Sequence, residues 1–144
     1  MIDATDDRQS DDAVGRADEA ESSTRRALLR TAVARSLSND GFGSVQVISP
    51  EMSSRVLTEK RREIIDVLDS TEISSQRDLA RKLDRDPGAV QRDLTELIEA
   101  GIVEIHEEGR SKRPTLTHDT VVVEPLVAPD SALEDAEYTV QNEP

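Results

Sequence analysis

Cysteine and tryptophan are absent from this 144-residue sequence, which holds one phenylalanine and one tyrosine. Without cysteine the chain has no disulfide, thiolate nucleophile or cysteine-ligated zinc, and it fits the reducing environment of the cytoplasm. No apolar run approaches the roughly 20 residues that a membrane-spanning helix needs. With Phe42 and Tyr138 as the only aromatic residues, no pocket for a small-molecule ligand is indicated. We therefore expect a cytoplasmic protein that binds neither membrane nor small ligand.

Acidic side chains outnumber basic ones by 31 to 18, which gives a net charge of −13. Such a chain repels nucleic acid as a whole, so any nucleic-acid role must be local. Residues 1–24 carry 8 acidic and 2 basic side chains, residues 119–144 carry 7 and none, and residues 25–56 carry 2 and 5. The low apolar content of the ends predicts a disordered acidic tail over residues 1–24 and an acidic tail over residues 124–144. This acidic, lysine-poor composition resembles that of proteins from halophilic archaea.

Between the tails, residues 25–55 are predicted to form an amphipathic helix and a short strand. Ser22, Ser23 or Thr24 can cap a helix that ends near Leu37. Apolar and polar residues alternate over residues 42–48, which predicts a strand, and a short helical turn then leads to Arg55.

Residues 56–123 contain the clearest start and stop signals in the chain. Apolar stripes at helical spacing predict helices over residues 59–68, 75–83 and 87–100. Thr58 and the Asp86–Pro87 pair are good helix starts, and Gly101 is a good helix end. A strand over residues 102–106, a charged turn over residues 107–114 and a return strand beginning at Leu116 are expected next. The predicted core consists of Ile65, Leu68, Leu79, Leu83, Val90, Leu94, Leu97 and Val103.

Three helices followed by a hairpin are the order of a winged helix-turn-helix domain. The predicted fold is therefore mainly α with a small β-hairpin, an α+β winged helix-turn-helix core between acidic tails. Five short motifs carry a resemblance to a known family: residues 56–61 (VLTEKR), 77–83 (RDLARKL), 90–94 (VQRDL), 100–103 (AGIV) and 109–114 (GRSKRP). These phrases resemble haloarchaeal MarR-like winged helix-turn-helix transcriptional regulators, a group of predicted DNA-binding proteins. The resemblance covers residues 56–123 and implies a transcriptional regulator that binds double-stranded DNA.

The third predicted helix has a polar face suited to the major groove. At 100° per residue Arg92 lies opposite the apolar face of Val90 and Leu94, and Gln91 lies on the flank. Arginine pairs with guanine and glutamine with adenine, so both side chains are candidates for reading bases. Small residues at Gly88 and Ala89 permit a close approach.

Two further groups of residues are expected to hold phosphates. Around Gly109 the basic residues of the wing can reach the DNA backbone, and the start of the second helix offers backbone N–H groups beside Arg77. The complete predicted DNA-binding set is Ser75, Gln76, Arg77, Gly88, Ala89, Gln91, Arg92, Thr95, Arg110, Lys112 and Arg113.

Nothing in the sequence indicates catalysis, a metal or a cofactor. His106 and His118 are the only histidines, and they are expected to be cross-strand neighbours in the hairpin without further ligands at metal spacing. No phosphate loop or nucleophile elbow is present. Two alternatives to DNA binding stay open: an acidic winged-helix adaptor that binds another protein, and an antitoxin-like partner. A homodimer is also predicted, through residues 25–37 or residues 121–126, because winged-helix regulators usually pair to read two half-sites.

Overall fold

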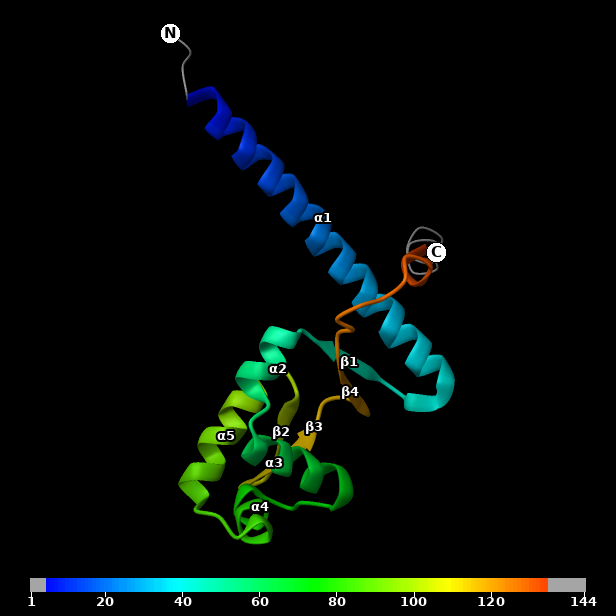
Figure 1. Ribbon diagram of the computed structural model, residues 1–144. Helices are drawn as coiled ribbons and strands as arrows, with labels where there is room; N and C mark the ends of the chain where they lie inside the picture. The colour runs from blue at the N-terminus through cyan, green and yellow to red at the C-terminus, as the bar shows by residue number, and fades with distance from the viewer. Residues whose placement is uncertain (1–4, 135–144) are drawn as a thin grey trace.

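The structure is a computed structural model that describes residues 5–134, with side chains from residue 19 onward (Figure 1). Short helices and a hairpin form one body, and a long N-terminal helix with a second strand pair lies at one end of it. The elements, in chain order, are α1 (Thr5–Leu37), η1 (Ser38–Phe42), β1 (Val45–Ile48), α2 (Pro50–Val56), α3 (Glu59–Ser70), α4 (Gln76–Leu83), α5 (Pro87–Glu99), β2 (Val103–Glu108), β3 (Ser111–Leu116) and β4 (Thr120–Val123). In the described part of the chain, no helix is long and apolar enough to cross a membrane.

Helices α3, α4 and α5 begin where their capping residues predict. The Thr58 side chain accepts a hydrogen bond from the Arg61 backbone N–H, and the Ser75 side chain accepts one from Asp78. Asp86 does the same for Ala89, with Pro87 in the first turn of α5. With the β2–β3 hairpin these helices make a mainly helical winged helix-turn-helix fold, as expected.

The core of the winged helix lies where α3, α4, α5 and the hairpin meet. Five of the predicted core residues are fully buried: Leu79, Val90, Leu94, Leu97 and Val103. Ile65, Leu68 and Leu83 are only partly buried at its edge, whereas Ile64 is completely buried. The apolar residues of α3 span a wide arc, so its sequence alone does not decide which of two adjacent isoleucines points inward. Ile73 and Ile102 also join the core from the segments beside the helices.

The wing differs from the predicted hairpin in the length of its turn. Strands β2 and β3 pair antiparallel from Val103↔Leu116 to Glu108↔Ser111, so only Gly109 and Arg110 form the loop. The predicted turn over residues 107–114 is therefore wrong, and Leu116 ends the return strand rather than beginning it. Gly109 adopts a φ of +63°, which lets the chain reverse in two residues.

The two histidines are not neighbours across the hairpin. His106 pairs with Arg113 in the register, and His118 follows β3 in the connection to β4. Because the loop is shorter than predicted, residues 111–116 rather than residues after 116 lie opposite β2. The expected cross-strand histidine pair is thus wrong.

A parallel strand pair that the sequence does not predict joins β1 to β4, from Val45↔Thr120 to Ile48↔Val123. At its start the Asp119 carboxylate accepts hydrogen bonds from the backbone N–H and hydroxyl of Ser44, at 2.8 and 3.1 Å. These bonds hold the pKa of Asp119 below its usual value. A Cβ at Gly43 would lie 2.2 Å from this carboxylate, so glycine is required there.

Helix α1 is longer than the predicted helix. It ends at Leu37 as expected, but it begins at Thr5, within the stretch predicted to be disordered. Residues 5–24 lack an apolar stripe and are rich in aspartate and serine, which are weak helix formers, so neither periodicity nor propensity reveals this part of the helix. The predicted acidic C-terminal tail starts at Glu124, which is buried, and residues 135–144 of that tail lie outside the described residues.

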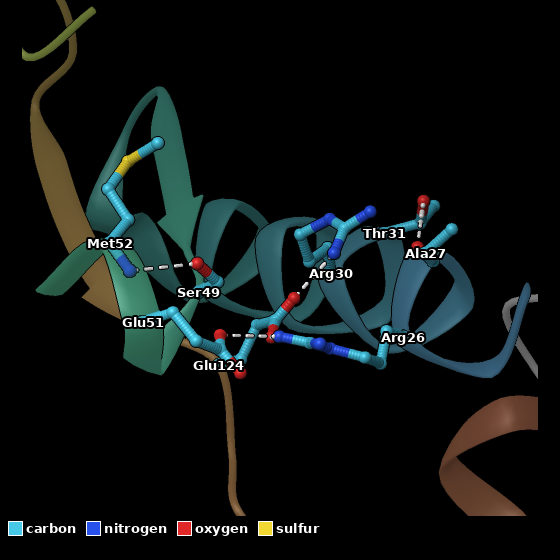
Figure 2. A network of polar contacts seen from close by, with 8 residues as sticks. All are labelled: Arg26, Ala27, Arg30, Thr31, Ser49, Glu51, Met52 and Glu124. Carbon is cyan, nitrogen blue, oxygen red and sulfur yellow. Dashed lines mark hydrogen bonds and ion pairs between the residues drawn. The ribbon is translucent and has the colours of Figure 1, made fainter. Parts of the chain in front are cut away.

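Figure 2 shows how α1 is fastened to the strand pair. Arg26 and Arg30, one helical turn apart, both donate to the Glu124 carboxylate, whose side chain is 5% exposed. Arg26 also donates to Glu51 at the start of α2, at 2.8 Å. Leu29 is buried beside them. Arg26 and Arg30 therefore connect α1 to the rest of the protein through ion pairs.

Candidate nucleic-acid interface

Helix α5 has the two faces that a recognition helix needs. Val90, Leu94 and Leu97 are at most 1% exposed, and they fix one side of the helix against the core. In the first turns, Arg92 is exposed on the side opposite the core and Gln91 is exposed on the flank. The helix therefore carries its base-reading candidates outward, at the end that enters a groove most deeply in winged helices.

The remaining α5 candidates shape this surface rather than add charge to it. Gly88 is exposed and Ala89 is half-buried, which keeps the first turn slim. The Thr95 hydroxyl donates to the Gln91 carbonyl at 2.9 Å, so its proton is already used within the helix. Two acidic side chains, Glu96 and Glu99, are exposed in the last turns.

The start of α4 already contains an acidic side chain, Asp78, that accepts hydrogen bonds from its neighbours. The Asp78 carboxylate accepts hydrogen bonds from Arg81 at 2.8 Å and from the Ser74 backbone N–H at 3.0 Å. These bonds lower the pKa of Asp78 to about 2. Ser75 uses its hydroxyl oxygen as the cap, and Gln76 is half-buried. The exposed Arg77 is therefore the group best suited to reach a phosphate at this end.

The wing separates the three basic residues that the sequence groups together. Side chains alternate along a strand, so Lys112 shares one face of the hairpin with its cross-strand partner Glu107, whereas Arg113 shares the other face with His106 and Glu108. Arg113 is one-third exposed and forms an ion pair with Glu108 at 3.3 Å. Arg110 lies at the exposed tip. Lys112 and Arg110 are thus open to solvent, whereas Arg113 already has an acidic partner.

Four of the predicted cations are free of internal partners within residues 19–134. None of the ion pairs among these residues includes Arg77, Arg92, Arg110 or Lys112. The more deeply buried Arg61 and Arg85 instead form ion pairs with Asp93. The surface that could contact an anion therefore consists of a few separate cations on α4, α5 and the wing.

One cluster beside α5 was not found from the sequence. Asp93 of α5 lies between Arg61 of α3, at 3.2 Å, and Arg85 in the turn before α5. Burial alone would raise the pKa of Asp93, but hydrogen bonds from Arg85 and Arg61 outweigh it and lower that pKa. The position of Asp93 at the border of the apolar face was the available signal. A charged residue there needs a partner from a neighbouring element.

No group of three or more histidine or acidic side chains within the described residues could hold a metal ion. His106 contacts Glu104 at 3.0 Å, and His118 contacts the Thr117 hydroxyl.

Comparison with known proteins adds a family match. The family model HVO_A0114 matches residues 56–123, just under half of the chain. These residues span α3, α4, α5, the wing and β4, the same stretch that the sequence predicts to be a winged helix. The match does not name the MarR class, which stays a prediction. No curated protein is significantly similar in sequence.

The solved structures that are similar to this chain include the following two. One is the homodimeric winged helix-turn-helix DNA-binding domain of a possible ArsR-family transcriptional regulator from Mycobacterium bovis, at 20% identity and a TM-score of 0.41. The match covers 63% of this chain and 73% of that one. The other is reduced HlyU from Vibrio cholerae, at 19% identity and a TM-score of 0.39, covering 63% and 80%.

Proposed function

We propose that this protein is a DNA-binding transcriptional regulator of the MarR-like type, not an enzyme, which acts in the cytoplasm of a halophilic archaeon. The observation that carries the proposal is the pair Gln91 and Arg92, exposed on the early turns of α5 while Val90 and Leu94 bury the opposite face. In the proposed complex α5 lies in the major groove. Arg92 donates to O6 and N7 of a guanine, and Gln91 pairs with an adenine.

The wing and α4 hold the backbone in this proposal. Arg110 and Lys112, both exposed, contact phosphates beside the groove that α5 occupies, and Arg77 contacts one from the start of α4. Arg113 contributes less than Lys112 because Glu108 already pairs with it. Contacts to phosphate carry no sequence information, so specificity rests on Gln91 and Arg92.

The net charge of −13 opposes DNA binding at low salt and matters less at high salt. At about 1 M salt the Debye length falls to about 3 Å, so acidic residues outside the interface scarcely act on a phosphate at the wing. Binding in a salt-rich cell then depends on the local cations.

Fluorescence anisotropy tests the proposal with an operator selected from random DNA, a scrambled control and a KCl series. Arg92→Ala should lose preference at one base pair, at a cost of roughly 1 to 3 kcal/mol. Lys112→Ala should weaken all sequences alike and lower the salt slope of log K by about 1. Arg62→Ala on α3 is the matched control, since it removes one exposed positive charge from a residue with no part in the proposed contacts.

A protein-binding adaptor is the second candidate, and the acidic side chains around the cations favour it. Glu96 and Glu99 are exposed on α5, and Glu107 faces Lys112 across the wing. If neither Arg92→Ala nor Lys112→Ala changes affinity for DNA, the adaptor function replaces the regulator.

We also propose that the regulator is a homodimer that pairs through α1. An open apolar groove of about 660 Å³ runs between the last turns of α1 and residues 125–132. Leu126 and Val127 beside it are 85% and 89% exposed. Strand β4 is already paired with β1, which favours α1 over residues 121–126 as the contact. Light scattering in molar KCl should give a dimer mass, and Val33→Asp, on the part of α1 that lines the groove, should give a monomer. A wild-type monomer at high concentration contradicts the proposal.

A further inference from the structure

We infer that Asp93 is a positioning residue for the recognition helix: with Arg61 and Arg85 it fixes the rotation of α5 that points Gln91 and Arg92 outward. The inference rests on the proposed function, because it assigns a role in base discrimination to a residue that makes no contact with DNA. Asp93 directly follows Arg92 in the sequence.

The cluster joins three elements at one carboxylate. Arg61 donates to one Asp93 oxygen from α3, and Arg85 donates to the other oxygen from the turn that precedes α5. The three side chains are only 18%, 14% and 18% exposed for Arg61, Arg85 and Asp93. Each Asp93 oxygen therefore has its own donor from a different element, and together the two bonds restrict the orientation of the carboxylate.

Both arginines are themselves anchored on backbone carbonyls. Arg61 donates to the Val56 carbonyl at 3.2 Å, at the end of α2, and Arg85 donates to the Lys60 carbonyl at 3.3 Å, in the first turn of α3. A rotation of α5 would therefore have to stretch or break either these bonds or the bonds to Asp93. The cluster consequently ties α5 to the fixed frame of α2 and α3.

The first turn of α5 needs such a tie because it contains little else that packs. Pro87, Gly88 and Ala89 offer small side chains, and Val90 is the first large residue buried in the core. Val90, Leu94 and Leu97 keep one side of α5 buried, but apolar contact is non-directional and permits small rotations of the sparsely packed first turn. Charge-assisted hydrogen bonds are directional, and two of them on Asp93 restrict that rotation.

The expected signature of this role is lost discrimination rather than lost affinity. Replacing Asp93 removes a negative charge near the interface, which by itself strengthens attraction to any DNA. A helix free to rotate aims Gln91 and Arg92 less accurately, which weakens binding to the operator alone. The ratio of operator affinity to scrambled-DNA affinity separates these two effects.

The test compares Asp93→Asn with Glu96→Gln in the full-length protein. Both variants remove one negative charge from α5, but Glu96 is exposed and lies outside every ion pair among residues 19–134. Anisotropy should show stronger binding to scrambled DNA in both variants. In Asp93→Asn alone, the ratio should fall about tenfold, the size of one weakened base contact. Arg61→Gln, which leaves Arg85 in place, should lower the ratio by less.

A measurement without DNA keeps this inference separate from the proposed function. Amide hydrogen exchange over residues 88–92 should be faster in Asp93→Asn than in Glu96→Gln under native conditions. If the wild type prefers no DNA sequence, the proposed function fails while the exchange experiment still tests the tie. Equal exchange in the two variants, or equal affinity ratios in a wild type that does discriminate, would overturn the role of Asp93.

Discussion

The winged helix packs ten buried apolar residues around one centre, whereas the outer layer of α1, β1 and β4 buries Leu29 and Ile48 and closes around Glu124. Each region contains a carboxylate held between two arginines: Asp93 in the winged helix and Glu124 in the outer layer. In the winged helix the Asp93 cluster adds directional hydrogen bonds to elements that an apolar core already holds together. In the outer layer the cluster replaces much of the core, so that layer should be the less stable and the more sensitive to salt.

The largest expected effect comes from truncating the apolar core of the winged helix. Leu94 is 1% exposed, and Leu94→Ala should lower the free energy of unfolding by about 2 to 5 kcal/mol through the cavity that it leaves. Leu29→Ala is the matched change in the outer layer, and we expect a smaller loss because Leu29 is 9% exposed. Urea unfolding measures both. Equal losses would show that the two regions are equally well packed.

The second largest effect is expected from removing the carboxylate that holds the outer layer together. Glu124→Gln leaves Arg26 and Arg30 without their shared carboxylate, and each of these arginines is 41% exposed, so water compensates in part. We expect α1 to exchange its amides faster and to be cut sooner by protease, with little change in α3–α5. Glu51→Gln is the control, because it removes only one exposed contact of Arg26. Global loss of protection would contradict a separable outer layer.

Local signals account for the part of the fold that the sequence predicts. Thr58, Asp86–Pro87 and Gly101 mark helix ends through interactions within a few residues, so α3, α4 and α5 follow from the chain itself. The charged residues 107–114 mislead in the wing, because exposed edge strands also carry charge. As a result, the sequence does not show that Lys112 and Arg113 lie on opposite faces.

Non-local pairings account for most of the remainder. Strands β1 and β4 are 75 residues apart along the chain at Val45 and Thr120, and no local pattern pairs them. Arg26 and Arg30 are one helical turn apart, which indicates a shared partner, but the sequence does not say that it is Glu124. The same holds for Asp93 and its two arginines, whose partners come from other elements.

The smallest expected effect is the pH dependence that Asp78 gives to the winged helix. The pKa of Asp78 is about 2 in the folded protein, against 3.8 for the unperturbed group, because Arg81 and the Ser74 N–H bind the charged form. A lowered folded pKa stabilises the fold above about pH 4, and that stabilisation is lost as the pH falls from about 4 to about 2. Asp78→Asn should therefore unfold at lower urea than wild type at pH 6, and the difference should shrink toward pH 2. Glu72→Gln, a nearby exposed carboxylate, controls for the general effect of charge. A difference in urea stability between Asp78→Asn and wild type that stays constant from pH 6 to pH 2 would contradict this prediction. It would show that the charge of Asp78 does not stabilise α4, and that in the winged helix, unlike in the outer layer, the ion pairs at this site add no stability.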